Sequence, residues 1–178
     1  MESAYQFYRQ LVKYEGFYLH SSAVEYGGRA YLFSASSGTG KSTHTRLWQS
    51  LFGEEARVFN DDKPALRYLD GRWLAYGTPW CGKDGININM KAPVAGICFL
   101  RRGGENSIRR LTALEATARI LSQTMHRFYD AEYIDLLASH IDKLVREIPV
   151  YELCCLPDED AARLSYETMR RGAMEAGL

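Results

Sequence analysis

The sequence predicts an α/β fold in which a mixed β-sheet is followed by a helical C-terminal third. Short apolar runs of strand length fill the first two-thirds of its 178 residues. Two of these runs are joined by Gly27-Gly28, which is typical of an antiparallel hairpin, and the second run leads straight into a helical pattern. Amphipathic helical patterns dominate the last third. We expect residues 1–178 to form a single domain.

The elements of the first half follow from these patterns in order. They are a weak helical segment (4–13), a strand (17–26), a strand (31–33), a helix beginning at Lys41, a strand (57–62) and a hairpin of strands (65–69 and 73–76). Gly53 is a plausible C-cap for the helix. Residues 78–85 form a glycine-rich polar loop with one lysine, Lys83.

The second half begins with a buried strand over residues 94–100, closed by the charged turn 101–104. Thr112 and Glu115 form a capping box before a helix that runs to about Met125. A second amphipathic helix spans residues 131–147, a strand follows at 149–156, and Asp158 caps a last helix.

The segment from Ala35 to Thr43 joins a strand to a helix and reads Ala-Ser-Ser-Gly-Thr-Gly-Lys-Ser-Thr, which is the context of a phosphate-binding P-loop. We expect its backbone N–H groups to surround phosphate oxygens, with Gly38 and Gly40 allowing the chain to turn inward. Lys41 would contact the β- and γ-phosphates, and the Ser42 hydroxyl would ligate Mg²⁺. The predicted nucleotide-binding residues are Ser37, Gly38, Thr39, Gly40, Lys41, Ser42 and Thr43.

One position departs from the P-loop pattern. Ala35 stands where the motif has its first glycine, so the turn must avoid a positive φ there or carry strain. Alternatively, Ser42 or Thr43 is an ordinary capping residue in a serine- and glycine-rich turn.

Asp61 and Asp62 end a buried strand downstream of this loop. A phosphotransferase needs a carboxylate to support Mg²⁺ and often a second one to accept the proton of the acceptor hydroxyl. We expect Asp61 to be the base and Asp62 to support the metal, although the two roles could be exchanged. Alternatively, Asp-Asp-Lys-Pro is simply a turn.

Two further side chains are candidates for the same site. His20 on an early strand would orient or polarise the base, or contact the phosphoryl group, and Lys83 would stabilise transferred charge from a mobile loop. His44, His126 and His140 lie in helical patterns without metal-ligand spacing and are interpreted as structural.

Composition narrows the class of protein. Basic and acidic residues number 22 each, so there is no global electrostatic case for nucleic acid binding. Apolar runs are too short for a membrane span, and the N-terminus lacks the apolar region of a signal peptide, which predicts a cytoplasmic protein. Cys98 lies in an apolar strand pattern, and adjacent Cys154 and Cys155 would face opposite sides of a strand.

These residues carry a resemblance to a known family. Leu19-His20-Ser21-Ser22-Ala23-Val24, the Ala35–Ser42 loop and Asn60-Asp61-Asp62 together resemble the catalytic domain of HPr kinase/phosphorylase, and more broadly the P-loop kinases related to phosphoenolpyruvate carboxykinase. The match spans roughly residues 15–105, with weaker similarity in residues 149–153. Neither the extra N-terminal domain nor the carrier-recognition segment of the larger bifunctional members is found.

The resemblance implies a kinase that uses ATP and Mg²⁺. Its acceptor would be a serine or other hydroxyl of a small protein, peptide or small molecule, and it would act without nucleic acid or membrane. The protein could form a homo-oligomer, but no interface can be recognised in the sequence. Two alternatives remain: a nucleotide-binding sensor or assembly module of the same fold without phosphotransfer, and a phosphorylase- or carboxykinase-like activity.

Overall fold

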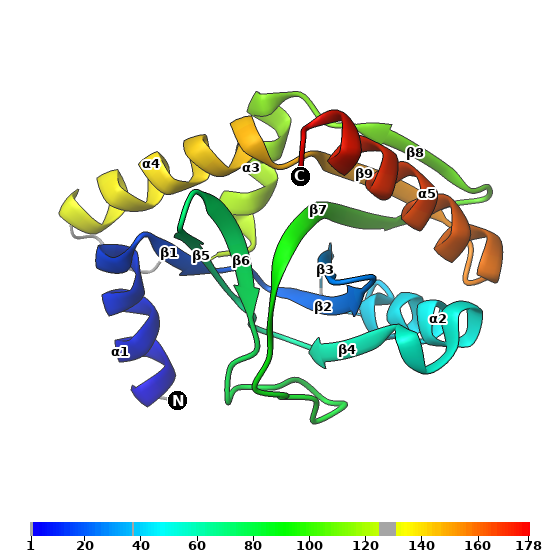
Figure 1. Cartoon of the computed structure of the whole chain (residues 1–178), viewed down its shortest axis with the longest axis horizontal. Helices are drawn as coiled ribbons and strands as arrows, with labels where there is room; N and C mark the ends of the chain where they lie inside the picture. Colours follow the sequence, from blue (N-terminus) through cyan, green and yellow to red (C-terminus); the bar gives the residue numbers. More distant parts are fainter. Residues whose placement is uncertain (1, 37, 125–130) are drawn as a thin grey trace.

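The computed structural model describes residues 2–36, 38–124 and 131–178 (Figure 1). Its helices are α1 (Glu2–Leu11), α2 (Lys41–Phe52), α3 (Ala113–Ser122), α4 (Ala131–Glu147) and α5 (Glu159–Glu175), with short 3₁₀ turns η1 (Val12–Tyr14) and η2 (Gly53–Glu55). Its strands are β1 (Gly16–Tyr18), β2 (Ser21–Tyr26), β3 (Arg29–Ser34), β4 (Arg57–Asn60), β5 (Ala65–Leu69), β6 (Arg72–Tyr76), β7 (Lys91–Arg102), β8 (Ser107–Arg110) and β9 (Val150–Cys155).

In these ranges the strands form one mixed sheet in the order β1-β5-β6-β7-β3-β2-β4, and β9 pairs with both β7 and β8. The β3–β7 and β7–β9 pairs are parallel, and the other pairs are antiparallel. The long strand β7 pairs with β6 near its start and with β9 near its end. The mixed α/β architecture predicted from the sequence is therefore confirmed, including the helical last third.

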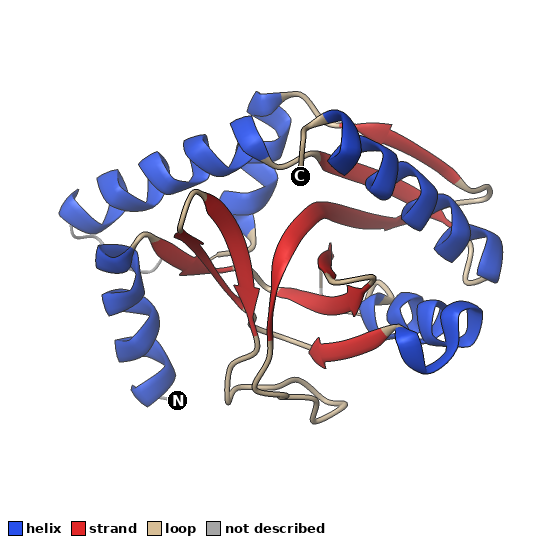
Figure 2. Cartoon of the chain, viewed as in Figure 1, coloured by secondary structure: helices blue, strands red, loops and turns tan. Residues whose placement is uncertain are grey.

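Helices cover both faces of the sheet (Figure 2). Along β3, side chains alternate between two apolar clusters: Ala30 and Leu32 belong to the cluster beneath α3 and α4, and Tyr31 and Phe33 belong to the cluster beneath α2 and α5. This alternation follows from the two-residue repeat of a strand. A strand buried on both faces is typical of the parallel part of an α/β sheet and gives the loop after β3 a rigid support.

The strand expected over residues 17–26 is interrupted at Leu19 and His20. β1 pairs with β5, whereas β2 pairs with β3 and β4. Between them the backbone N–H of His20 donates to the carbonyl oxygen of Gln123 at 2.7 Å instead of joining a strand ladder. The break leaves His20 just before β2, where its side chain reaches Lys41 at the end of the loop that follows β3.

Most local predictions are confirmed. Gly27 and Gly28 have positive φ in the β2–β3 turn, Gly53 is the C-cap of α2, Thr112 and Glu115 form a capping box, and the Asp158 side chain caps α5. Strand β8 was not predicted, because Ile108 is its one apolar residue. Arg109 of β8 pairs with Glu152 of β9 at 3.3 Å, so a polar edge strand is held by charge as well as by its ladder.

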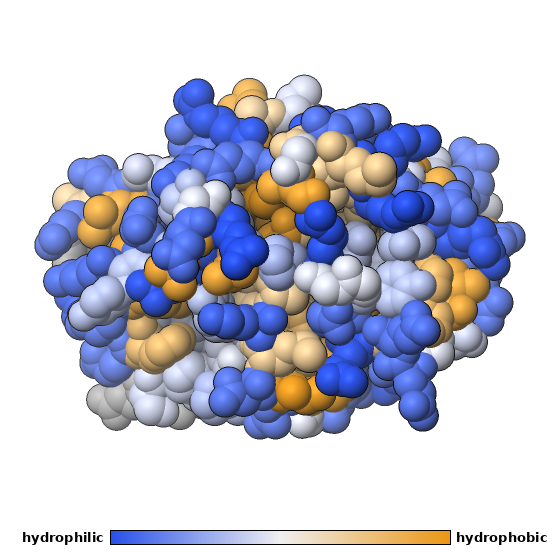
Figure 3. All heavy atoms as spheres, in the orientation of Figure 1, coloured by the Kyte–Doolittle hydropathy of each residue, from blue (hydrophilic) through white to orange (hydrophobic). Residues whose placement is uncertain are grey.

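The surface is ordinary for a globular protein. On the face in Figure 3, apolar residues form separate patches between hydrophilic ones. Within the described ranges, no helix combines the length and the apolar character that crossing a membrane requires.

Candidate nucleotide-binding and phosphotransfer site

The loop between β3 and α2 is shaped by its glycines. Gly38 and Gly40 have φ values of 78° and 120°, in the region that residues with a Cβ rarely adopt. Gly40 is also the N-cap residue of α2 and supplies no side-chain cap, so the first amides of the helix stay open to a ligand. This end of α2 also carries the positive end of the helix dipole, which favours anions.

Ala35, the departure from the P-loop pattern, is accommodated without strain. It is buried, and it is not among the described non-glycine residues with positive φ, which are Glu15 and Asp70. Its carbonyl oxygen accepts a hydrogen bond from Nζ of Lys41 at 3.2 Å. The backbone therefore needs no glycine at position 35.

A cavity of about 400 Å³ lies in front of this loop. It brings together most of the residues predicted for the site: His20, Gly38, Gly40, Lys41, Ser42, Thr43, Asp61, Asp62 and Lys83. Thr39 lines a neighbouring cavity that shares the loop. Ser37 lies outside the described residues, as does His126.

Three side chains that line the cavity, those of His20, Lys41 and Asp62, lie close together. Nε2 of His20 lies 3.1 Å from Nζ of Lys41 and 3.3 Å from Oδ1 of Asp62. The other ring nitrogen, Nδ1, lies 3.0 Å from Oε1 of Gln123. Because Oε1 only accepts, Nδ1 carries the proton, and Nε2 is then free to accept from Lys41.

The electrostatics favour this neutral form of His20. Burial, and after it the charge of Lys41, lowers the pKa of His20. Burial also lowers the pKa of Lys41, partly opposed by the carboxylate of Asp62. The contact between Nε2 and Asp62 becomes a hydrogen bond only if Nε2 gains a proton, so Lys41 and Asp62 compete for the same atom.

The two aspartates have different surroundings. Oδ1 of Asp61 accepts from the backbone N–H of Gly82 at 2.7 Å, and Oδ2 accepts from the N–H of Asp84 at 2.9 Å. Asp61 therefore fastens the glycine-rich loop to the end of β4. Asp62 instead turns toward His20 and forms an ion pair with Lys63.

The glycine-rich loop is held at further points. Arg46 of α2 forms an ion pair with Asp84 at 2.6 Å, and the N–H of Ile88 donates to the carbonyl of Phe59 at 2.8 Å. Lys83, expected on a mobile loop, thus lies on a segment tied to both α2 and β4, with its side chain on the cavity.

Sequence reasoning missed three residues of this region. Arg102, at the end of β7, donates to the carbonyl oxygens of Gly38 at 2.6 Å and Thr39 at 3.3 Å. Lys63 pairs with Asp62, and Gln123 binds both the backbone and the ring of His20. The charged turn predicted over residues 101–104 was a weak signal for Arg102, although Arg101 and Arg102 belong to β7. Gln123 lies 103 residues from His20 in sequence and gave no signal.

Within the described ranges, no three His, Cys, Asp or Glu side chains are grouped as a metal site. The side-chain oxygens on the cavity that suit Mg²⁺ belong to the hydroxyls of Ser42 and Thr43 and to the carboxylates of Asp61 and Asp62. Such a small oxygen set fits a cation that keeps several waters and binds substrate phosphates.

The fold has a known counterpart. The chain is similar to the Hpr(Ser) kinase/phosphatase from Coxiella burnetii, with a TM-score of 0.50 and 12% identity over 89% of this chain and 90% of that one. The expected resemblance is thereby confirmed at the level of the fold. Residues 1–157 match the family described as SynChlorMet cassette protein ScmC, and the chain belongs to that family. No curated protein matches it.

Proposed function

We propose that this protein is an ATP- and Mg²⁺-dependent kinase that transfers a phosphoryl group to a hydroxyl of a small protein, peptide or small molecule. The observation that carries the proposal is the meeting of Lys41, His20 and Asp62 in front of the open end of α2. An anion site, a cation and a carboxylate within one cavity are the parts that phosphoryl transfer uses.

In this proposal the loop 38–43 binds the phosphates through its backbone amides, and Lys41 neutralises the β- and γ-phosphates. With the roles of the two aspartates exchanged, Mg²⁺ would be held by Ser42 with support from Asp61, and it would neutralise phosphate charge when bound. To reach the phosphates, Lys41 must leave its present acceptors, Ala35 O and His20 Nε2. Nucleotide binding would therefore free Nε2 to gain a proton and then donate to Asp62.

We propose Asp62, rather than Asp61, as the base. Both aspartates lie on the cavity, but Asp61 is bound by two backbone amides of the loop 78–85, whereas the partners of Asp62 are the side chains of His20 and Lys63. The acceptor oxygen bonds to the γ-phosphorus, the bond to the β–γ bridging oxygen breaks, and ADP leaves. The hydroxyl proton passes to the Asp62 carboxylate.

The test measures Mg²⁺-ATP binding by calorimetry and ADP release with a panel of hydroxyl-bearing acceptors. We expect Lys41→Ala to weaken ATP binding about 100-fold, as expected for losing charge-assisted bonds, while Lys91→Ala, a change in an exposed lysine at the start of β7, has no effect. Binding without turnover would favour the sensor alternative. Turnover that needs inorganic phosphate would favour the phosphorylase alternative, and no binding would refute the proposal.

A further inference from the structure

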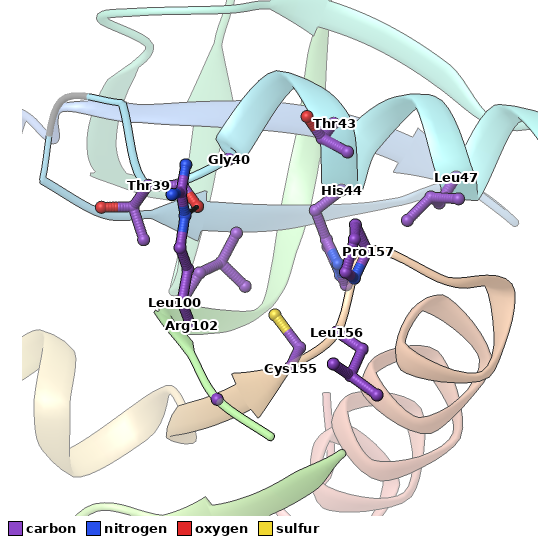
Figure 4. A pocket seen from close by; sticks show the side chains of 11 residues that line it. Thr39, Gly40, Thr43, His44, Leu47, Leu100, Arg102, Cys155, Leu156 and Pro157 are labelled. Carbon is purple, nitrogen blue, oxygen red and sulfur yellow. Dashed lines mark hydrogen bonds between the residues drawn. The ribbon is translucent and has the colours of Figure 1, made fainter. Parts of the chain in front are cut away.

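A second cavity, of about 290 Å³, borders the same loop at Thr39 and Gly40 (Figure 4). Its walls come from α2, from the end of β7 and from the connection between β9 and α5. Gly40, Thr43 and Arg102 line both this cavity and the charged one described above. A ligand bound at Gly40 and Thr43 can therefore extend into either space.

The two spaces differ in chemistry. The first is lined by carboxylates and lysines, whereas the second has Leu47, Leu100, Leu156 and Pro157 in its walls. A triphosphate and its acceptor suit the charged space. A flat ring system suits the second, because apolar walls with a few polar groups are the usual setting for small-molecule rings.

His44 adds a neutral polar group to this wall. Ser165 Oγ donates its single proton to Ala162 O at 2.8 Å and accepts from Trp48 Nε1 at 3.0 Å. The remaining contact, 3.0 Å to Nε2 of His44, then requires Nε2 to donate. Nδ1 is left with a lone pair that no described residue uses.

The ring of His44 also stays uncharged, since burial lowers the pKa of His44 to about 4. An uncharged wall does not repel an apolar ring, and the lone pair on Nδ1 can accept a hydrogen bond from an amino group of the ligand. Arg102, fixed by its bonds to Gly38 and Thr39, adds a planar cation at the junction of the two cavities. Guanidinium planes stack well on aromatic rings.

We infer that the cavity between α2, the end of β7 and the β9–α5 connection binds the base of the nucleotide whose phosphates lie on the Gly38–Thr43 loop. The inference rests on the proposed function, because it needs a nucleotide at that loop. It assigns to Leu47 and Leu156 apolar contacts with the base; neither residue takes part in phosphate binding or in transfer in the proposed function.

The experiment compares two ligands by calorimetry with Mg²⁺: ATP and ribose 5′-triphosphate, which has the same phosphates and sugar but no base. The wild type should bind ATP at least about tenfold more tightly, since a base with apolar contacts adds binding free energy. Leu156→Ser should weaken ATP binding about fivefold and leave ribose 5′-triphosphate unchanged.

Leu121→Ser on α3 is the matched control, because the side chains of Leu121 and Leu156 are equally exposed, at 38% each. It should change neither affinity. Equal affinities of the wild type for the two ligands, or an equal loss of both in Leu156→Ser, would overturn the base site while leaving the phosphate site standing. Failure of both ligands to bind the wild type would refute the proposed function and the base site together.

Discussion

His20 and Lys41 share a hydrogen bond, 3.1 Å between Nε2 and Nζ, that joins the residue before β2 to the first residue of α2. In a P-loop kinase the lysine would have to bind phosphate, so this bond belongs to the ligand-free protein. In the proposed function, nucleotide binding would change the surroundings of His20, because Lys41 would exchange the ring nitrogen for a phosphate oxygen.

The pKa of His20 should report this exchange. The charge of Lys41 holds that pKa down, so Lys41→Met should raise it. The rise should appear in an NMR titration of the ring nitrogens, together with a change in the protonation of Nε2. Lys91→Met, at the exposed start of β7, is the control, and an unchanged His20 pKa in Lys41→Met would contradict the hydrogen bond.

Substitution of Asp62 should affect transfer, whereas substitution of Asp61 should affect stability. Asp62→Asn should leave stability and ATP binding near wild type but reduce transfer by about 100- to 10,000-fold, the usual contribution of a general base. Steady-state transfer to an accepted hydroxyl, with calorimetry for binding, measures both quantities.

Asp61→Asn should instead destabilise the protein. One carboxylate oxygen becomes an amide donor that faces the N–H of Gly82 or Asp84, so unfolding should be about 1–3 kcal/mol easier. Urea unfolding measures this loss. An Asp61→Asn protein of unchanged stability that has lost transfer would restore Asp61 as the base.

The β3–loop–α2 segment could be predicted from sequence because its signals are local. An apolar strand, glycines at the turn and a helical repeat all lie within one short stretch, and Ala35 did not disturb them. The caps of α3 and α5 were predicted for the same reason. His20 and the aspartate pair were assigned to this loop from the needs of phosphotransfer chemistry and from the resemblance to a family, not from a local pattern.

The distinct surroundings of Asp61 and Asp62 could not be predicted. They depend on where the loop 78–85 folds back, and the amides of Gly82 and Asp84 give no sequence signal. The contact of Gln123 with His20 likewise joins the end of α3 to the start of β2. The break at His20 was missed because an apolar pattern does not reveal which strand each half pairs with.

Arg102 should matter for nucleotide binding through the loop that it holds. Arg102→Ala removes two hydrogen bonds to Gly38 and Thr39 carbonyls and a positive charge beside the cavity, so ATP affinity should fall about five- to tenfold. Amide exchange in the loop should also become faster. Arg101→Ala, in the neighbouring exposed arginine, is the matched control, and equal losses in the two variants would contradict this role.

Stability should decrease in mild acid because of His44. Its folded-state pKa of about 4 lies below the ordinary value of 6.5, so between these values the unfolded chain binds a proton that the folded protein resists. The stabilisation is fully present above about pH 6.5 and is lost as the pH falls toward about 4. The loss attributable to this residue is at most roughly 3 kcal/mol.

Urea unfolding of wild type and His44→Gln between about pH 7 and about pH 4.5 measures this contribution. The variant should start less stable, since it loses ring packing against Phe33 and the contact with Ser165, but its stability should fall less with acid. The lowered pKa of His20 adds a loss of the same sign to both proteins, so only the difference between the two slopes belongs to His44. Parallel slopes would show that the His44 ring takes up its proton as readily in the folded protein as in the unfolded chain. The His44 ring could then not be treated as an uncharged part of the wall of the second cavity.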